Sequence, residues 1–138
     1  MFPVSHKILK HIFFFLCAVV LFFACKKADT TPVATIKGNI TLTVTAQHHS
    51  WVIPGLPVYL KSNATEFPGT NTASYNASTT TNQGGDAQFK TLTFGNYYLY
   101  ARGWDPIFGD TVYGHIPVVV DSSTAGGNLV YVTMFVTE

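Results

Sequence analysis

Cysteine is nearly absent from this chain. Only Cys17 and Cys25 occur among the 138 residues, and no thiol follows residue 25. The chain beyond that point therefore has no internal disulfide, and its stability depends on packing. The same absence excludes a cysteine nucleophile and a cysteine-ligated metal from that part of the chain.

Charged side chains are also scarce, at 11% of the residues, and the formal net charge is +1. No basic patch favours nucleic acid, and no run of like charges forms a tail. The sequence also lacks Gly-x-Ser-x-Gly, His-Glu-x-x-His and a phosphate-binding loop. We therefore predict that the protein is not an enzyme, binds no nucleic acid and needs neither a cofactor nor a metal.

A continuous apolar run is present near the start of the chain. Lys7 and Lys10 precede it, and it extends over 13 residues from Ile12 to Ala24. A helix that spans a bilayer needs about 20 apolar residues. A basic region followed by a run of roughly 7–15 is instead typical of a secretory signal peptide. We predict a signal peptide over residues 1–24.

Cys25 follows directly after this run, with the small residue Ala24 before it. This arrangement resembles the lipobox of bacterial lipoproteins, except that Phe22 occupies the position where leucine is usual. The resemblance implies that Cys25 carries palmitate-type acyl chains and anchors the protein to a membrane. Because Lys26 rather than aspartate follows, the resemblance favours the outer membrane. Residues 25–34 would be the lipidated cysteine and a tether; the alternative is an uncleaved signal anchor.

From residue 35 onward the pattern is that of an all-β domain. Apolar residues alternate with polar ones, β-branched and aromatic residues dominate, and glycine, proline or asparagine interrupts them about every ten residues. The alternation predicts a seven-stranded antiparallel β-sandwich over residues 35–138. The expected strands are 36–46, 58–61, 74–81, 86–92, 96–102, 110–120 and 129–137.

One spacing is more specific than the rest, and it runs Gly85-x-Ala87-x-Phe89-x-x-Leu92-x-x-Gly95-x-Tyr97-x-Leu99. It resembles the core pattern of carboxypeptidase regulatory-like domains, which belong to the transthyretin-like (prealbumin-like) β-sandwiches. Two further blocks, 36–40 and 53–60, are similar to that family in the same order. The resemblance implies a prealbumin-like Greek key. It also leaves an enzyme of this group as a minor alternative, for which Asp105, Asp110 and His115 would be the first candidates.

Alternating strands place every second loop at the same end of a sandwich. Loops 47–54, 82–86 and 103–109 would then share an end, and both tryptophans lie in them. Because binding sites concentrate in loops held by a rigid scaffold, we predict a ligand site there. Its candidate residues are His48, His49, Trp51, Asn82, Asp86, Trp104 and Asp105. The alternatives are that the tryptophans only cap the core and that the histidines are solvated loop residues.

A second candidate surface lies on the outward face of one predicted strand. Tyr98, Tyr100 and Arg102 share that face by period two, and Tyr59 lies on a strand that could pair beside it. A row of tyrosines is suited to packing against a partner protein. Outward tyrosines also occur in strands from propensity alone, which is the alternative here.

These observations favour a lipid-anchored binding or adhesion module of the cell envelope, whose partner is a glycan or an envelope protein. The alternative is a structural accessory subunit of an outer-membrane assembly.

Overall fold

The computed structural model describes residues 38–138 of the chain. The predicted signal peptide 1–24, the predicted acylation of Cys25 and the predicted tether 25–34 lie outside these residues. Within residues 38–138, no helix is long and apolar enough to cross a membrane.

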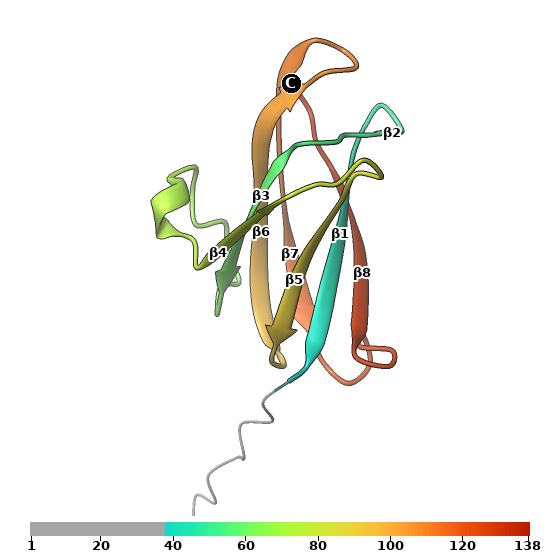
Figure 1. Cartoon of the computed structure of the whole chain (residues 1–138). Coiled ribbons are helices and arrows are strands. Elements are labelled where there is room, and N and C mark those ends of the chain that lie inside the picture. Colours follow the sequence, from blue (N-terminus) through green and yellow to red (C-terminus); the bar gives the residue numbers. More distant parts are fainter. Residues whose placement is uncertain (1–37) are drawn as a thin grey trace, which may run out of the picture. The chain divides into compact units, whose positions relative to one another are not determined.

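The described residues form eight strands and one short 3₁₀ helix (Figure 1). The strands are β1 (Ile40–His48), β2 (Trp51–Val52), β3 (Pro57–Ser62), β4 (Ala77–Thr80), β5 (Asp86–Leu92), β6 (Gly95–Asp105), β7 (Asp110–Val120) and β8 (Leu129–Phe135), and the 3₁₀ helix η1 spans Thr72–Ser74. All seven predicted strands are present. The eighth, β2, has two residues and forms a hairpin with the end of β1.

The strands form two sheets of four (Figure 1). In the first, β1 pairs antiparallel with β5 and β2 and parallel with β8. In the second, the order is β4-β3-β6-β7 and every pair is antiparallel. The predicted all-β sandwich is confirmed. The β1–β8 pair is an exception to the antiparallel pattern, since these two strands run in the same direction.

The core lies between the two sheets and follows the period-two pattern of the sequence. Leu42, Val44 and Ala46 of β1 face Leu99 and Ala101 of β6, and all five are fully buried. Ala87, Phe89 and Tyr97 of the motif are buried as well, as the inward positions of the pattern require. Each methylene removed from water here contributes about 0.8 kcal/mol.

Gly85 shows why the motif begins with glycine. Its φ angle is +77°, and a Cβ atom at this position would lie 2.6 Å from Cβ of Val52. Any other residue would be both strained and in collision. This close approach holds the β4–β5 loop against β2, next to the end of β1.

The segment between β3 and β4 covers the outer face of the second sheet. Its Phe67 ring lies 5.6 Å from the ring of Tyr100 and 4.2 Å from that of His115, and Tyr75 lies 5.9 Å from Tyr100. Burial, together with the neighbouring phenols of Tyr100 and Tyr98, raises the pKa of Tyr75. An aromatic layer therefore exists outside the sandwich core.

Candidate functional site

The three loops expected to share an end do meet in the structure. The backbone N–H of Ala46 donates to the carbonyl of Gly85 over 2.9 Å, which joins β1 to the β4–β5 loop. His48 at the end of β1 contacts Asp105 at the end of β6. Figure 1 shows the β1–β2 and β6–β7 hairpins at this end, while β1 begins at the other. We call this end of the sandwich the tip.

The pair His48–Asp105 closes the tip between the two sheets. Each residue continues the inward alternation of its strand, so His48 follows Ala46 and Asp105 follows Ala101 and Gly103 in phase. His48 is 3% exposed and Asp105 is not exposed at all. The two side chains are joined by a hydrogen bond of 2.9 Å between Nδ1 and Oδ2.

Asp105 is held as a carboxylate at this buried position. Burial by itself raises the pKa of Asp105, but hydrogen bonds from the N–H of Ile107, from His48 and from the N–H of Phe108 outweigh it and hold the pKa below its ordinary value. The Ile107 bond is 2.8 Å long. Because the carboxylate only accepts, Nδ1 of His48 carries the proton and donates it. Nε2 is then the atom of His48 with a free lone pair when the ring is neutral.

His49 lies on the same side of the chain as His48, although neighbouring residues of a continuous strand face opposite ways. Its φ angle is +49° and that of Ser50 is +71°. Two consecutive positive φ angles in a two-residue hairpin define a type I′ turn, which breaks the strand alternation after His48. As a result the two imidazole rings lie with their centroids 4.2 Å apart.

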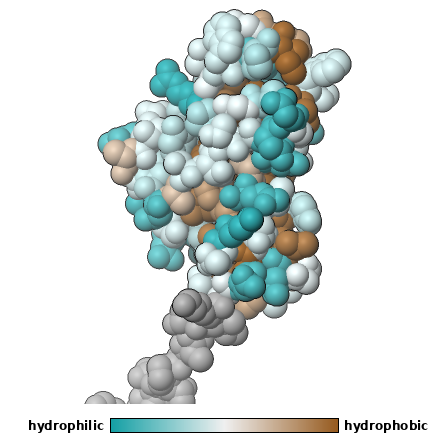
Figure 2. All heavy atoms as spheres, in the orientation of Figure 1, coloured by the Kyte–Doolittle hydropathy of each residue, from teal (hydrophilic) through white to brown (hydrophobic). Residues whose placement is uncertain are grey.

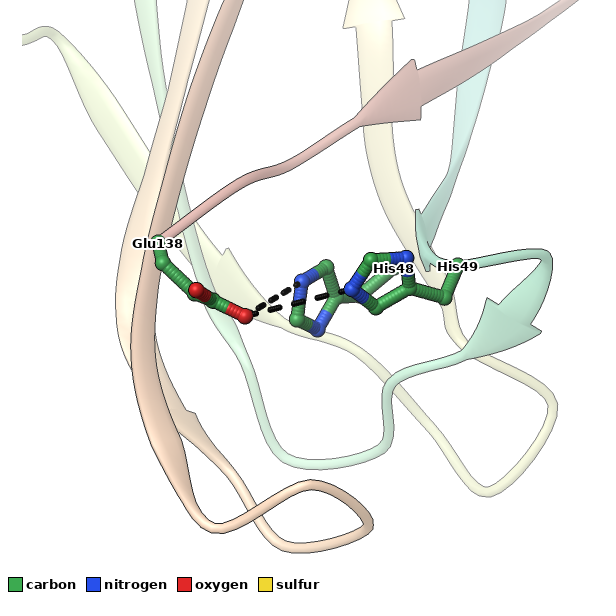
Figure 3. A group of neighbouring side chains, drawn as sticks. All are labelled: His48, His49 and Glu138. Atoms are coloured by element: carbon green, nitrogen blue, oxygen red, sulfur yellow. Dashed lines mark ion pairs between the residues drawn. The ribbon is translucent and has the colours of Figure 1, made fainter.

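Glu138 approaches both histidines from beyond β8 (Figure 3). Its Oε1 atom lies 3.8 Å from Nε2 of His48 and 3.9 Å from Nε2 of His49. The ring of Phe108 packs edge-on against both imidazoles, at 5.2 Å from each centroid. Glu138 and Phe108 are not among the predicted site residues, since neither lies near His48 in sequence.

Trp51 and Trp104 are exposed at the tip, at 61% and 60% of their surface. Each tryptophan therefore leaves more than half of its surface open to solvent. Ile107 and Phe108 of the neighbouring hairpin are also exposed, at 48% and 42%. Figure 2 shows hydrophobic atoms at the surface of this end, where Figure 1 places the β6–β7 hairpin.

Asn82 and Asp86 are occupied by the turn that they build. The Asn82 side-chain oxygen accepts from the N–H groups of Gly84 and Asp86, at 2.8 Å and 3.1 Å. The Asp86 carboxylate accepts from the Thr45 hydroxyl at 2.6 Å. These two predicted site residues support the loop, each through one side-chain oxygen.

The predicted tyrosine face is mostly covered, which corrects the expectation of an exposed partner surface. Tyr98 and Tyr100 point outward from β6, but only 7% and 1% of their surface is exposed, because Phe67 and Tyr75 lie over them. Tyr59 is half-buried beside Tyr100, and Arg102 remains exposed.

A pocket of about 360 Å³ opens where this face meets the tip. It is lined by Thr70, Tyr100, Arg102, Thr111, Tyr113 and Glu138. Glu138 thus borders both the pocket and the histidine pair. The residues named for an enzyme, Asp105, Asp110 and His115, are not among those that line this pocket.

No protein-family model matches the chain, and no curated protein matches it. Among solved structures, it is similar to BcpA, the major pilin subunit of Bacillus cereus, with 13% identity, a TM-score of 0.48, and coverage of 72% of this chain but 30% of the pilin. It is also similar to PA1324, a candidate carbohydrate-binding protein of Pseudomonas aeruginosa, with 16% identity, a TM-score of 0.45 and coverage of 74% and 92%. At TM-scores below 0.5, neither likeness carries an argument about function.

Proposed function

We propose that this protein is a lipid-anchored binding module of the cell envelope, and that its tip binds a glycan or an envelope protein. The observation that carries the proposal is the exposure of Trp51 and Trp104, at 61% and 60%, on two hairpins braced from inside by His48 and Asp105. Large exposed aromatics on a rigid support are typical of binding surfaces.

Further exposed apolar side chains at the tip support a binding role. Ile107 and Phe108 add to the tryptophans, and contiguous exposed apolar surface on a small domain marks interaction sites. A prealbumin-like, carboxypeptidase regulatory-like architecture is part of the proposal, and it supplies the scaffold on which such loops vary. We propose no catalytic role.

The proposed lipid anchor implies an orientation of the domain relative to the membrane. Gly38 lies against Leu92 and Thr93, at the end of the sandwich opposite the tip. A lipid on Cys25 would hold that end near the outer membrane, and the tip would then project away from the bilayer. The periplasm and the cell surface are both compatible with this orientation.

Replacing Trp51 or Trp104 by alanine is expected to weaken partner binding by about 30-fold or more, because aromatic hot spots contribute about 2 kcal/mol or more each. The measurement is binding of the full chain in detergent to a glycan panel and to envelope proteins, followed by tryptophan fluorescence. Phe94→Ala is the matched control, since Phe94 is 46% exposed but lies in the β5–β6 turn at the opposite end. Unchanged binding in both tryptophan variants would exclude the tip as the binding surface.

Cys25→Ser is expected to release the protein from the membrane fraction, because the acyl chains can no longer be attached. Fractionation of cells, combined with metabolic labelling by a fatty acid, measures both effects. Cys17→Ser should leave anchoring and labelling unchanged. If the Cys25 variant stays membrane-bound, an uncleaved signal anchor replaces the lipoprotein hypothesis.

A structural accessory subunit is the second candidate, and one observation favours it. Tyr131 and Phe135 on the outer face of β8 are 70% and 72% exposed, with Leu129 at 41% on the same face. An apolar stripe on a sheet edge is suited to a protein contact. If this face is the binding surface, Tyr131→Ser lowers binding in the experiment above and the tryptophan variants do not.

A further inference from the structure

Three side chains at the tip present metal-ligating atoms to one another. His48, His49 and Glu138 each offer one ligand atom, and these three atoms all lie within 4.8 Å of one another (Figure 3). We propose that they bind one divalent transition-metal ion of the zinc class. This inference goes beyond the proposed function and does not depend on it, because it concerns an ion rather than a partner.

The distances from Glu138 to the two histidines suit ligands of a shared ion better than a direct hydrogen bond. At 3.8 Å and 3.9 Å, Oε1 of Glu138 is too far from either nitrogen for a hydrogen bond. Bonds of about 2.0–2.1 Å to a tetrahedral zinc ion place ligand atoms about 3.3 Å apart. A contraction of about half an ångström would therefore bring Oε1 of Glu138 to this spacing from each of the two nitrogens. Glu138 is 62% exposed and has the side-chain freedom to move that far.

Asp105 orients His48 as a metal ligand. Histidine ligands in proteins usually donate their second ring N–H to a carboxylate, which fixes the tautomer and the ring orientation. The 2.9 Å bond from Nδ1 of His48 to Asp105 has this arrangement, and it leaves Nε2 toward Glu138. Among the described residues, the side-chain hydrogen bond of the His48 ring is made by Nδ1 and not by Nε2, so it does not compete with an ion at Nε2.

The donor set determines the class of metal. Two imidazoles and one carboxylate suit zinc and its first-row neighbours, whereas calcium and magnesium prefer oxygen donors alone. Three protein ligands leave a fourth position open to water or to a ligand atom. His49 is 63% exposed, so this position is accessible from solvent. A bound ion would also connect the β1–β2 hairpin to the chain beyond β8.

The test is calorimetric titration of the purified full chain in detergent with zinc chloride, after dialysis against a chelator. We expect one zinc ion per chain. His49→Ala and Glu138→Gln should each weaken its binding at least 10-fold, as is common when a metal site loses a supporting group. Both residues are exposed, so these variants should fold. His115→Ala and Glu66→Gln are the matched controls, because they remove the same groups from elsewhere on the surface.

Two further measurements separate the site from other metal binding. The double variant Cys17→Ser/Cys25→Ser should retain the zinc ion, because no thiol belongs to the site. Cobalt substituted for zinc should give the visible absorption of nitrogen and oxygen ligands, without sulfur charge-transfer bands. Absence of saturable zinc binding, equal affinity in His49→Ala and His115→Ala, or loss of binding with the cysteines would each overturn the proposal. The tryptophan variants should bind zinc normally, so failure of the binding-module proposal would leave this result unaffected.

Discussion

Asp105→Ala is expected to lower the free energy of unfolding by about 2–5 kcal/mol. The variant removes the acceptor of Nδ1 of the buried His48 and of the partly buried N–H of Ile107. Buried donors that lose a partner retain their desolvation cost, so the loss exceeds that of an average hydrogen bond. Equilibrium unfolding in urea, followed by the fluorescence of the two nearby tryptophans, measures the change.

The neighbouring strand offers a control for this variant. Asp110 is the register partner of Asp105 across the β6–β7 pair, but its side chain is exposed. Asp110→Ala should change the free energy of unfolding by no more than about 0.5 kcal/mol. Both measurements are made in the presence of a chelator, so that bound metal does not contribute to the free energy of unfolding. Equal, small effects in the two variants would show that the His48–Asp105 pair does not hold the tip together.

The sandwich itself was predictable because alternation is a local signal. Inward residues at even positions from Ile40 to Ala46 specify one buried face, and the same rule identified the strand around Tyr97 and Leu99. The boundaries were less accurate. β1 continues to His48 and β6 to Asp105, where polar residues occupy inward positions and were assigned to loops.

The candidate metal site could not be predicted from the sequence. Its geometry depends on a type I′ turn at His49 and Ser50, although asparagine and glycine are the residues that usually signal that turn. It also depends on Glu138, which is 90 residues from His48 in the numbering and is brought to it by the pairing of β1 with β8 and of Thr137 with Tyr113. The in-phase positions of His48 and Asp105 were the one available signal of a contact between the sheets.

The tyrosine face failed as a predicted partner surface for a different reason. The outward direction of Tyr98 and Tyr100 follows from strand period, but their exposure depends on what lies over the sheet. The segment between β3 and β4 contains Pro68, Gly69 and several asparagines and threonines, without strand or helix periodicity. Nothing local in such a segment predicts that Phe67 and Tyr75 dock onto a sheet.

Tyr100→Ala should therefore lower the free energy of unfolding by about 3–5 kcal/mol, the usual cost of removing a buried aromatic side chain. Tyr100 is 1% exposed, and its ring centroid lies 6.1 Å, 5.6 Å and 5.9 Å from those of Tyr59, Phe67 and Tyr75. Its loss would leave a cavity beneath the β3–β4 segment and remove the ring on which that segment packs. Urea unfolding measures the loss, and limited proteolysis should show earlier cleavage between residues 63 and 76.

Tyr131→Ala is the matched control, since the same side chain is removed from a position that is 70% exposed. Its free energy of unfolding should stay within about 0.5 kcal/mol of the unmodified protein. A near-zero cost for Tyr100→Ala would mean that the β3–β4 segment does not pack on this face in solution. The outward face of β6 would then be open to a partner protein, as the sequence alone predicts.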